Sequence, residues 1–83
     1  MPFNITYKSS VERDLRKLDK PIARRLLHRL EAELSRNPQA CPALKGPFAG
    51  LRKYRVGEYR VIFAILGQDV LVLRISHRRD AYR

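Results

Sequence analysis

Three cations close together between positions 51 and 63 are the residues most able to do chemistry in this sequence. Lys53 and Arg55 are two positions apart, so on a β-strand, where side chains alternate, they lie on one face. Gly57-Glu58 is a Gly-X pair suited to a tight hairpin turn, and Arg60 follows it at the start of a second predicted strand. Like charges that face each other across a sheet destabilise it by under about 1 kcal/mol per pair. Stability therefore does not select these residues, whereas binding of a polyanion against that face would.

The charge of the whole chain indicates the same kind of partner. The 83 residues include 18 Lys and Arg against 8 Asp and Glu, a net charge of +10, which favours nucleic acid or an acidic protein as partner. The single Cys41 excludes an internal disulfide and, with only two His, gives no metal-ligand pattern. No apolar run approaches the roughly 18 residues of a membrane span, and no signal peptide is visible. We therefore expect a cytoplasmic protein with no metal, cofactor or membrane partner.

Hydrophobic periodicity in the first half predicts a strand and two helices. Residues 3–7 alternate apolar and polar, which predicts a half-buried strand. Ser9 and Glu12 have the spacing of a capping box at the start of a short helix, which Pro21 ends because it cannot continue the hydrogen-bond ladder. A second helix, with apolar residues at helical spacing, follows and stops at Asn37-Pro38.

The second half is predicted to be a loop followed by three strands. Prolines and glycines over residues 39–50 indicate a loop, which we expect Leu44 and Phe48 to pin to the core. The hairpin extends through Ile65, and a last strand runs from Val70 to Ser76 after a turn. The element order is β-α-α-β-β-β. This predicts a small α+β single domain over residues 1–83, with a helical hairpin packed on a mostly antiparallel sheet.

Three segments of the chain resemble the motifs of the RelE/ParE toxin superfamily. Leu51 to Phe63 resembles its tyrosine- and arginine-rich hairpin. The ending Ile-Ser-His-Arg-Arg-Asp-Ala-Tyr-Arg, residues 75–83, resembles its C-terminal motif. Residues 14–18, followed by Pro21, resemble its first helix and turn. In this order and spacing the segments cover nearly the whole chain, and the resemblance implies a RelE-like fold with a basic concavity on the sheet face that the helices leave uncovered.

The RelE branch of this superfamily contains messenger RNA interferases, and the resemblance implies the same metal-independent endoribonuclease chemistry here. An internal 2′-OH attacks the adjacent phosphate and gives a 2′,3′-cyclic phosphate, which requires a base, cations around the developing charge, and an acid. The matching positions in this chain are Lys53, Arg55, Arg60, Arg78 and Tyr82. Lys53 and Arg55 would neutralise the phosphate, and Arg60 would bind its oxygen bidentately. Arg78 would stabilise the leaving 5′-oxygen, as a charge or as an unusual acid. Tyr82 would stack on a base or act as the general base.

His77 is the alternative to Tyr82 for acid–base work, because it titrates near neutrality without help. Strand parity puts His77 opposite Arg78, if the strand stays regular that far. A histidine that donates a hydrogen bond to a backbone carbonyl at the end of a strand is an equally consistent interpretation.

Two other functions stay open at this stage. A ParE-like toxin on the same fold inhibits DNA gyrase and cleaves no nucleic acid, and an inactive basic binding module would keep the surface without the activity. All five positions of the RelE-like site are filled, which favours RNA cleavage. The resemblance also implies the partners: the ribosomal A site with its message, and a co-produced acidic antitoxin similar to RelB.

Overall fold

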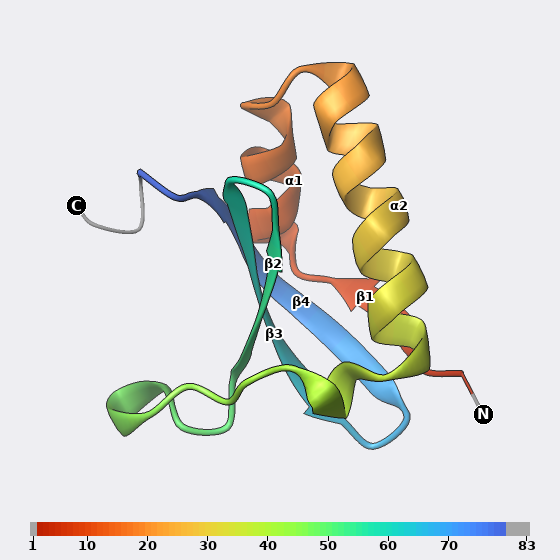
Figure 1. The fold of residues 1–83 in the computed structure, drawn as a ribbon, viewed down its shortest axis with the longest axis vertical. Helices are drawn as coiled ribbons and strands as arrows, with labels where there is room; N and C mark the ends of the chain where they lie inside the picture. Colours follow the sequence, from red (N-terminus) through yellow and green to blue (C-terminus); the bar gives the residue numbers. More distant parts are fainter. Residues whose placement is uncertain (1, 80–83) are drawn as a thin grey trace.

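The computed structural model describes residues 2–79, and its elements follow the predicted order (Figure 1). They are β1 (Asn4–Tyr7), α1 (Ser9–Arg16), α2 (Lys20–Arg36), β2 (Arg52–Val56), β3 (Tyr59–Leu66) and β4 (Asp69–His77), with two short 3₁₀ turns, η1 (Pro38–Ala40) and η2 (Gly46–Phe48), between α2 and β2. The predicted element order and the α+β fold class are confirmed.

The strands form one sheet in the order β1-β4-β3-β2. β1 runs parallel to β4, whereas β2 with β3 and β3 with β4 are antiparallel pairs, so the sheet is mostly antiparallel as predicted. Both α-helices lie on the same side of the sheet (Figure 1). The opposite face of the hairpin, which bears Lys53, Arg55, Arg60 and Ile62, is called the open face below.

The core forms between the helices and the inner face of the sheet. Its buried apolar residues are Val11, Leu26, Leu30, Leu34, Val61, Phe63, Val70, Val72 and Ile75. Leu26, Leu30 and Leu34 recur every four residues along α2, which confirms the predicted helical spacing of its apolar residues. Ile22, one turn before Leu26, is 37% exposed. Burial of one such side chain contributes about 1.5–3 kcal/mol, so α2 and the two central strands, β3 and β4, provide most of the apolar stabilisation.

β4 contains a bulge that reverses the alternation of its side chains halfway along. Phe63 pairs with Val72 and Ile62 pairs with Arg74, so Leu73 is an extra residue between them. An extra residue on one strand bends it and increases its twist. Here it allows Val72 and Ile75, three positions apart, both to face the core.

α1 takes the place of a neighbouring strand along the second half of β4. β1 pairs only with residues 69–72 of β4. Beyond them, Ser10 Oγ donates a hydrogen bond to the carbonyl of Leu73 (2.7 Å). Oδ2 of Asp14 accepts from the N–H of Ile75 (2.9 Å) and from Nε of Arg74 (3.1 Å). Asp14 is only 7% exposed, so this buried carboxylate has its hydrogen bonds supplied by β4.

The predicted capping box is wrong. α1 begins at Ser9 itself, Lys8 occupies the N-cap position, and no side chain caps the helix. The backbone N–H of Lys8 donates to the carbonyl of Val72 (2.9 Å), so pairing with β4 keeps the chain extended up to Lys8. α1 starts directly after Lys8, and Ser10 in its first turn reaches β4. Pro21 likewise lies in the first turn of α2 rather than at the end of α1, a position where its missing N–H is tolerated.

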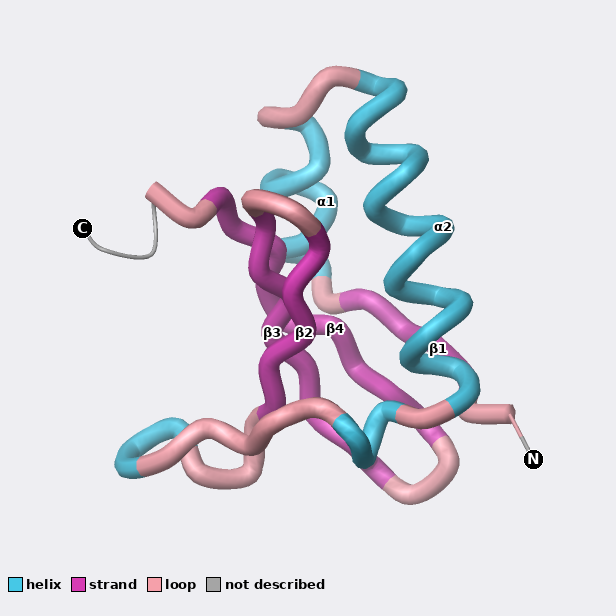
Figure 2. Tube along the Cα trace, viewed as in Figure 1, coloured by secondary structure: helices cyan, strands magenta, loops and turns pink. Residues whose placement is uncertain are grey.

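The segment between α2 and β2 crosses the lower part of the view of Figure 2, from the helix side towards the side away from the helices. Leu44 in this loop is half-buried, whereas Phe48 is 59% exposed. The prediction that both residues pin the loop to the core is therefore wrong for Phe48. The reason is the path of the loop, which carries η2 away from the helices and from the core between helices and sheet (Figure 2).

Asp14→Ala should destabilise the fold by about 1–3 kcal/mol, because the buried N–H of Ile75 loses its acceptor. Arg74→Ala should cost under about 1 kcal/mol, since the Arg74 side chain is 58% exposed and Ile75 keeps its acceptor. Urea unfolding followed by circular dichroism measures both changes. Glu12→Ala, which removes an exposed carboxylate from the same helix, is the matched control. Equal losses for Asp14→Ala and Glu12→Ala would contradict the role of Asp14.

Candidate nucleic-acid interface

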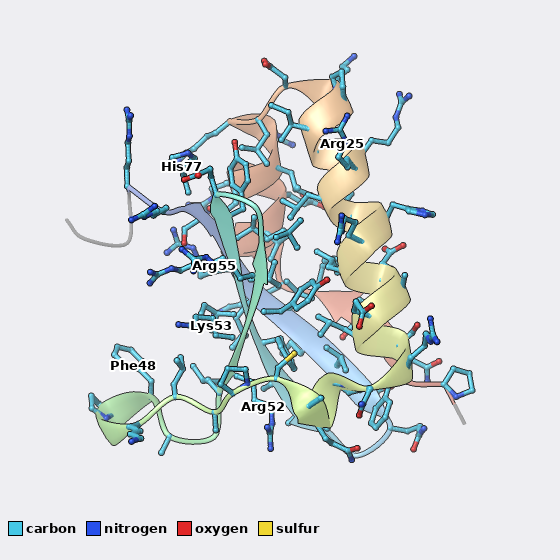
Figure 3. All side chains as sticks on the ribbon, in the orientation of Figure 1. Arg25, Phe48, Arg52, Lys53, Arg55 and His77 are labelled. Carbon is cyan, nitrogen blue, oxygen red and sulfur yellow. The ribbon has the colours of Figure 1, made fainter. Side chains whose placement is uncertain are left out.

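Three of the predicted cations meet on the open face of the hairpin. Arg55 on β2 is directly opposite Arg60 on β3, and Lys53, two residues earlier, is opposite Ile62. Opposite residues on antiparallel strands have Cβ atoms about 4.5–5.5 Å apart, so the side chains of Arg55 and Arg60 start close together. Figure 3 shows Lys53 and Arg55 pointing away from the helices. The predicted clustering of these three residues is thus observed.

The hairpin has a tight turn, as predicted. Val56 pairs with Tyr59, which leaves Gly57-Glu58 as a two-residue loop. Gly57 has a positive φ of 57°, a conformation that a glycine adopts without steric cost. A short turn of this kind fixes the register of the two strands, and therefore fixes Arg55 opposite Arg60.

Ser76 and Arg78 lie at the same end of the sheet. Ser76 on β4 is opposite Arg60 on β3. Arg78, one of the predicted catalytic residues, is exposed just after β4, and its backbone N–H donates to the carbonyl of Glu58 (2.7 Å). This bond continues the β3–β4 pairing to the hairpin turn and holds the main chain of Arg78 near the cations of the hairpin.

A groove of about 420 Å³ opens on this face. Its apolar residues are Leu44, Phe48, Leu51, Ile62 and Leu73, and its polar residues are Lys53, Arg60, Arg74 and Ser76. The bulge at Leu73 contributes to this lining, because it brings Arg74 opposite Ile62. An apolar surface with several cations suits a ligand that combines flat apolar groups with negative charge.

His77 and Tyr82 are the residues predicted to do acid–base work, and the structure describes only His77. His77 is opposite Tyr59 on β3, and the two rings meet edge-to-face with centroids 5.1 Å apart. Because Tyr59 and Arg60 are consecutive on their strand, His77 lies on the helix-covered face, away from the three cations. Its Nδ1 accepts the backbone N–H of Arg79 (3.1 Å), so Nε2 bears the proton of the neutral ring. Tyr82 lies outside the described residues, and its role stays a prediction.

Arg52 is a structural residue that the sequence prediction missed. One of its guanidinium nitrogens donates to the carbonyls of Gln39 (3.1 Å) and Cys41 (2.7 Å), which ties the loop to β2. Strand parity was the signal that could have revealed it. Arg52 alternates in phase with the packing residue Tyr54 and out of phase with Lys53, so it belongs to the helix side, where a cation needs a partner.

Cys41 and Tyr7 have pKa values raised above their ordinary range. Burial raises the pKa of the Cys41 thiol, with an opposing effect of Arg52 and a smaller contribution from Glu33. Burial and the hydrogen bond to Glu31 raise the pKa of the Tyr7 hydroxyl. Both groups therefore stay protonated at neutral pH, and Cys41 is not an activated nucleophile.

No group of three or more His, Cys, Asp or Glu within residues 2–79 could hold a metal ion. No helix in the same range is long and apolar enough to cross a membrane.

Solved structures that include RelE-like toxins share the fold of this chain. The toxin–antitoxin complex RelBE2 from Mycobacterium tuberculosis contains a chain that matches with a TM-score of 0.84 and 29% identity, over 94% of this chain and 100% of that one. A mutant of the Escherichia coli toxin RelE in the free state matches with a TM-score of 0.76 and 18% identity, over 99% of this chain and 90% of that one. The RelE-like fold is therefore established.

The sequence comparisons define the family. Residues 5–82 match the family model of the ParE toxin of type II toxin–antitoxin systems. Toxin RelG of Mycobacterium tuberculosis is 33% identical over 86 residues, which span 100% of this chain and 99% of RelG. The chain belongs to the RelE/ParE superfamily and is a toxin of a type II toxin–antitoxin system.

Arg55→Gln should raise the free energy of unfolding by under about 1 kcal/mol at low salt, because it removes one of two facing cations. The gain should shrink at about 1 M salt, where charges are screened within about 3 Å. Lys45→Gln, which removes an exposed cation from the loop, is the control. Chemical unfolding at the two salt concentrations measures the difference. A loss of stability at low salt would show that Arg55 supports the hairpin.

Proposed function

We propose that this toxin is a ribosome-dependent endoribonuclease that cuts messenger RNA and so inhibits translation in the cytoplasm. The observation that supports this best is the facing pair of Arg55 and Arg60, with Lys53 beside it, on the open face of the sheet. Cations opposed in this way weaken a sheet. A bound phosphate chain neutralises them, so their placement favours a function in which RNA lies along this face.

The proposed reaction is attack by a 2′-OH of the message on the adjacent phosphate. The O2′–P bond forms while the P–O5′ bond breaks, which leaves a 2′,3′-cyclic phosphate and a free 5′-OH. Negative charge gathers on the phosphorane oxygens, and fixed cations stabilise it because they are in place before the charge develops. In this scheme Lys53 and Arg55 neutralise the phosphate, and Arg60 binds one of its oxygens bidentately.

Arg78 and Tyr82 complete the proposed mechanism. Arg78 stabilises the 5′-oxygen as it leaves, and this oxygen takes its proton from Arg78 as an unusual acid or from solvent water. Tyr82 removes the proton of the 2′-OH or stacks on a base. His77 is the alternative base. Its ring packs against Tyr59 on the helix-covered face, so it would act only on RNA that passes around the end of β4.

The ribosome requirement is supported by the composition of the site. Within the described residues, the polar side chains that line the groove are Lys53, Arg60, Arg74 and Ser76, and none of them is an ordinary general base at neutral pH. Positioning of the reacting groups must then supply much of the acceleration, and it can be worth about 7–11 kcal/mol. A message held in the ribosomal A site would provide such positioning.

Arg60→Ala and Arg78→Ala should each slow message cleavage in a translation reaction about 10²- to 10³-fold, because each removes one preorganised charge from the transition state. Primer extension maps and quantifies the breaks, with and without ribosomes. Arg24→Ala, which removes an exposed cation from α2, is the matched control and should leave the rate unchanged.

The same experiment has outcomes that would contradict the proposal. Naked RNA cut as fast as ribosome-bound message would remove the ribosome requirement. An Arg60→Ala or Arg78→Ala protein that is unfolded by circular dichroism would make that residue structural rather than catalytic.

Inhibition of DNA gyrase is the second candidate function, and the match of residues 5–82 to the ParE toxin family favours it. In this alternative the cations of the open face bind an acidic surface or DNA without cleavage. A supercoiling assay with purified gyrase separates the two functions. Blocked supercoiling together with an intact message would replace the nuclease by a gyrase inhibitor.

The partner that holds this toxin inactive is proposed to be an acidic antitoxin similar to RelB. The RelBE2 structure that this chain resembles is that of a toxin–antitoxin complex, and the net charge of +10 favours an acidic partner. We expect the antitoxin to contain a segment that is disordered alone and folds on binding as an amphipathic helix against an apolar and basic surface.

Antitoxin affinity should fall by less than about 100-fold between low and high salt, because contacts in an apolar groove are little screened whereas exposed charge pairs are screened beyond about 8–10 Å. Calorimetric titration at two salt concentrations measures this, and Lys53→Gln should flatten the salt dependence further. A larger loss would show that charge neutralisation dominates. Absence of binding at any salt would argue against the proposed partner.

A further inference from the structure

Phe48 is exposed to solvent although it has a large apolar ring. It is 59% exposed, more than any other large apolar side chain among the described residues. It therefore forgoes most of the stabilisation that burial of a phenylalanine would give. Single exposed apolar residues are common on protein surfaces, so exposure alone assigns no role to Phe48. The residues around Phe48 must indicate whether it binds a ligand.

Hydrogen bonds and a proline constrain the main chain around Phe48. η2 is closed by a hydrogen bond from the N–H of Ala49 to the carbonyl of Gly46 (3.0 Å), and the carbonyl of Phe48 itself accepts from the N–H of Leu51 (3.1 Å). Pro47 has a φ fixed by its ring. The ring of Phe48 is thus attached to a main chain that loses little freedom on binding a ligand.

Phe48 shares the groove of the open face with cations. The groove of about 420 Å³ is lined by Phe48 together with Lys53 and Arg60, and this volume is within the range of about 300–1,000 Å³ found for ligand sites. Figure 3 shows Phe48 and Lys53 on the same side of the sheet, opposite the helices. The ligand that matches this lining has a flat apolar group next to a negative charge.

A nucleotide of single-stranded RNA fits this chemistry better than an acidic peptide. An apolar anchor contributes most where the partner encloses it in a well-packed, desolvated pocket, and a short peptide has no pocket that could enclose Phe48. An exposed aromatic ring beside a basic groove is the arrangement on which nucleobases stack.

We propose that Phe48 is the stacking platform for one nucleobase of bound RNA, whose phosphates lie against Lys53 and Arg60. The inference rests on the proposed function in taking RNA as the ligand, and it adds a base-binding subsite to it. Because every base has a π-face, Phe48 contributes to affinity and to the position of the strand rather than to a strict choice of sequence.

The test uses a fluorescein-labelled 2′-fluoro RNA of about ten nucleotides, a length within the site sizes of single-strand binders. It has no 2′-OH and is not cleaved by the proposed reaction. Phe48→Ala should weaken binding of this probe about 5- to 150-fold in fluorescence anisotropy. Phe48→Trp should bind as well as wild type or better. Phe48→Leu keeps apolar bulk without a π-face and should behave like Phe48→Ala.

Two controls separate stacking from charge. An abasic oligonucleotide of the same length should bind equally to wild type and Phe48→Ala, because it has no base to stack. The salt dependence of probe binding should be the same for both, whereas Lys53→Gln should reduce its slope by about 0.7, the value for one phosphate of a single strand. Circular dichroism confirms the fold of each variant.

Phe48→Ala or Phe48→Leu affinities within about twofold of wild type would overturn the proposal, since stacking removal costs more than that. So would an equal loss with the abasic oligonucleotide, or a loss confined to antitoxin binding, which would move Phe48 to that interface. Message cleavage that persists without Phe48-dependent binding would overturn only the subsite. Phe48-dependent binding in a protein that cuts no message would leave the subsite and remove the nuclease.

Discussion

The hydrogen bonds of Asp14 are the interaction on which the second half of β4, next to the candidate site, depends. β1 is four residues long and pairs with only the first part of β4, so the rest of β4 would have unpaired main-chain groups. Asp14 and Ser10 of α1 satisfy two of them. A buried charge is tolerated when its hydrogen bonds are made. These contacts hold the part of β4 that contains the bulge at Leu73 and that leads to Arg78.

Side chains of a strand alternate between the two faces of the sheet, so one face can form the core while the other bears charge. On β3, Val61 and Phe63 are fully buried against the helices, while Arg60 and Ile62 line the groove of the open face. Stability is therefore provided on one face, and charge can be placed on the other at small cost. This division explains how a chain of 83 residues with a net charge of +10 keeps a cohesive core.

The sequence predicted those features that depend only on residues close together in the chain. The turn at Gly57-Glu58, the alternation of the strands and the clustering of Lys53, Arg55 and Arg60 followed from side-chain periodicity and turn chemistry. The bulge at Leu73, the anchoring by Asp14 and the exposure of Phe48 did not, because each depends on segments that are distant in sequence. Helix capping was mispredicted for the same reason: pairing of Lys8 with β4, rather than a local capping box, determines where α1 starts.

The position of β2 gives its cations a second consequence. β2 ends the strand order, and only its beginning is bridged, by Ala43 to Arg52. From Tyr54 onward its outer edge meets no other strand of the described chain. Such edges recruit the edges of other copies unless charged side chains discourage it. Lys53 and Arg55 thus also oppose edge-to-edge aggregation, so replacing them with aliphatic residues would expose the toxin to self-association even where it left the fold intact.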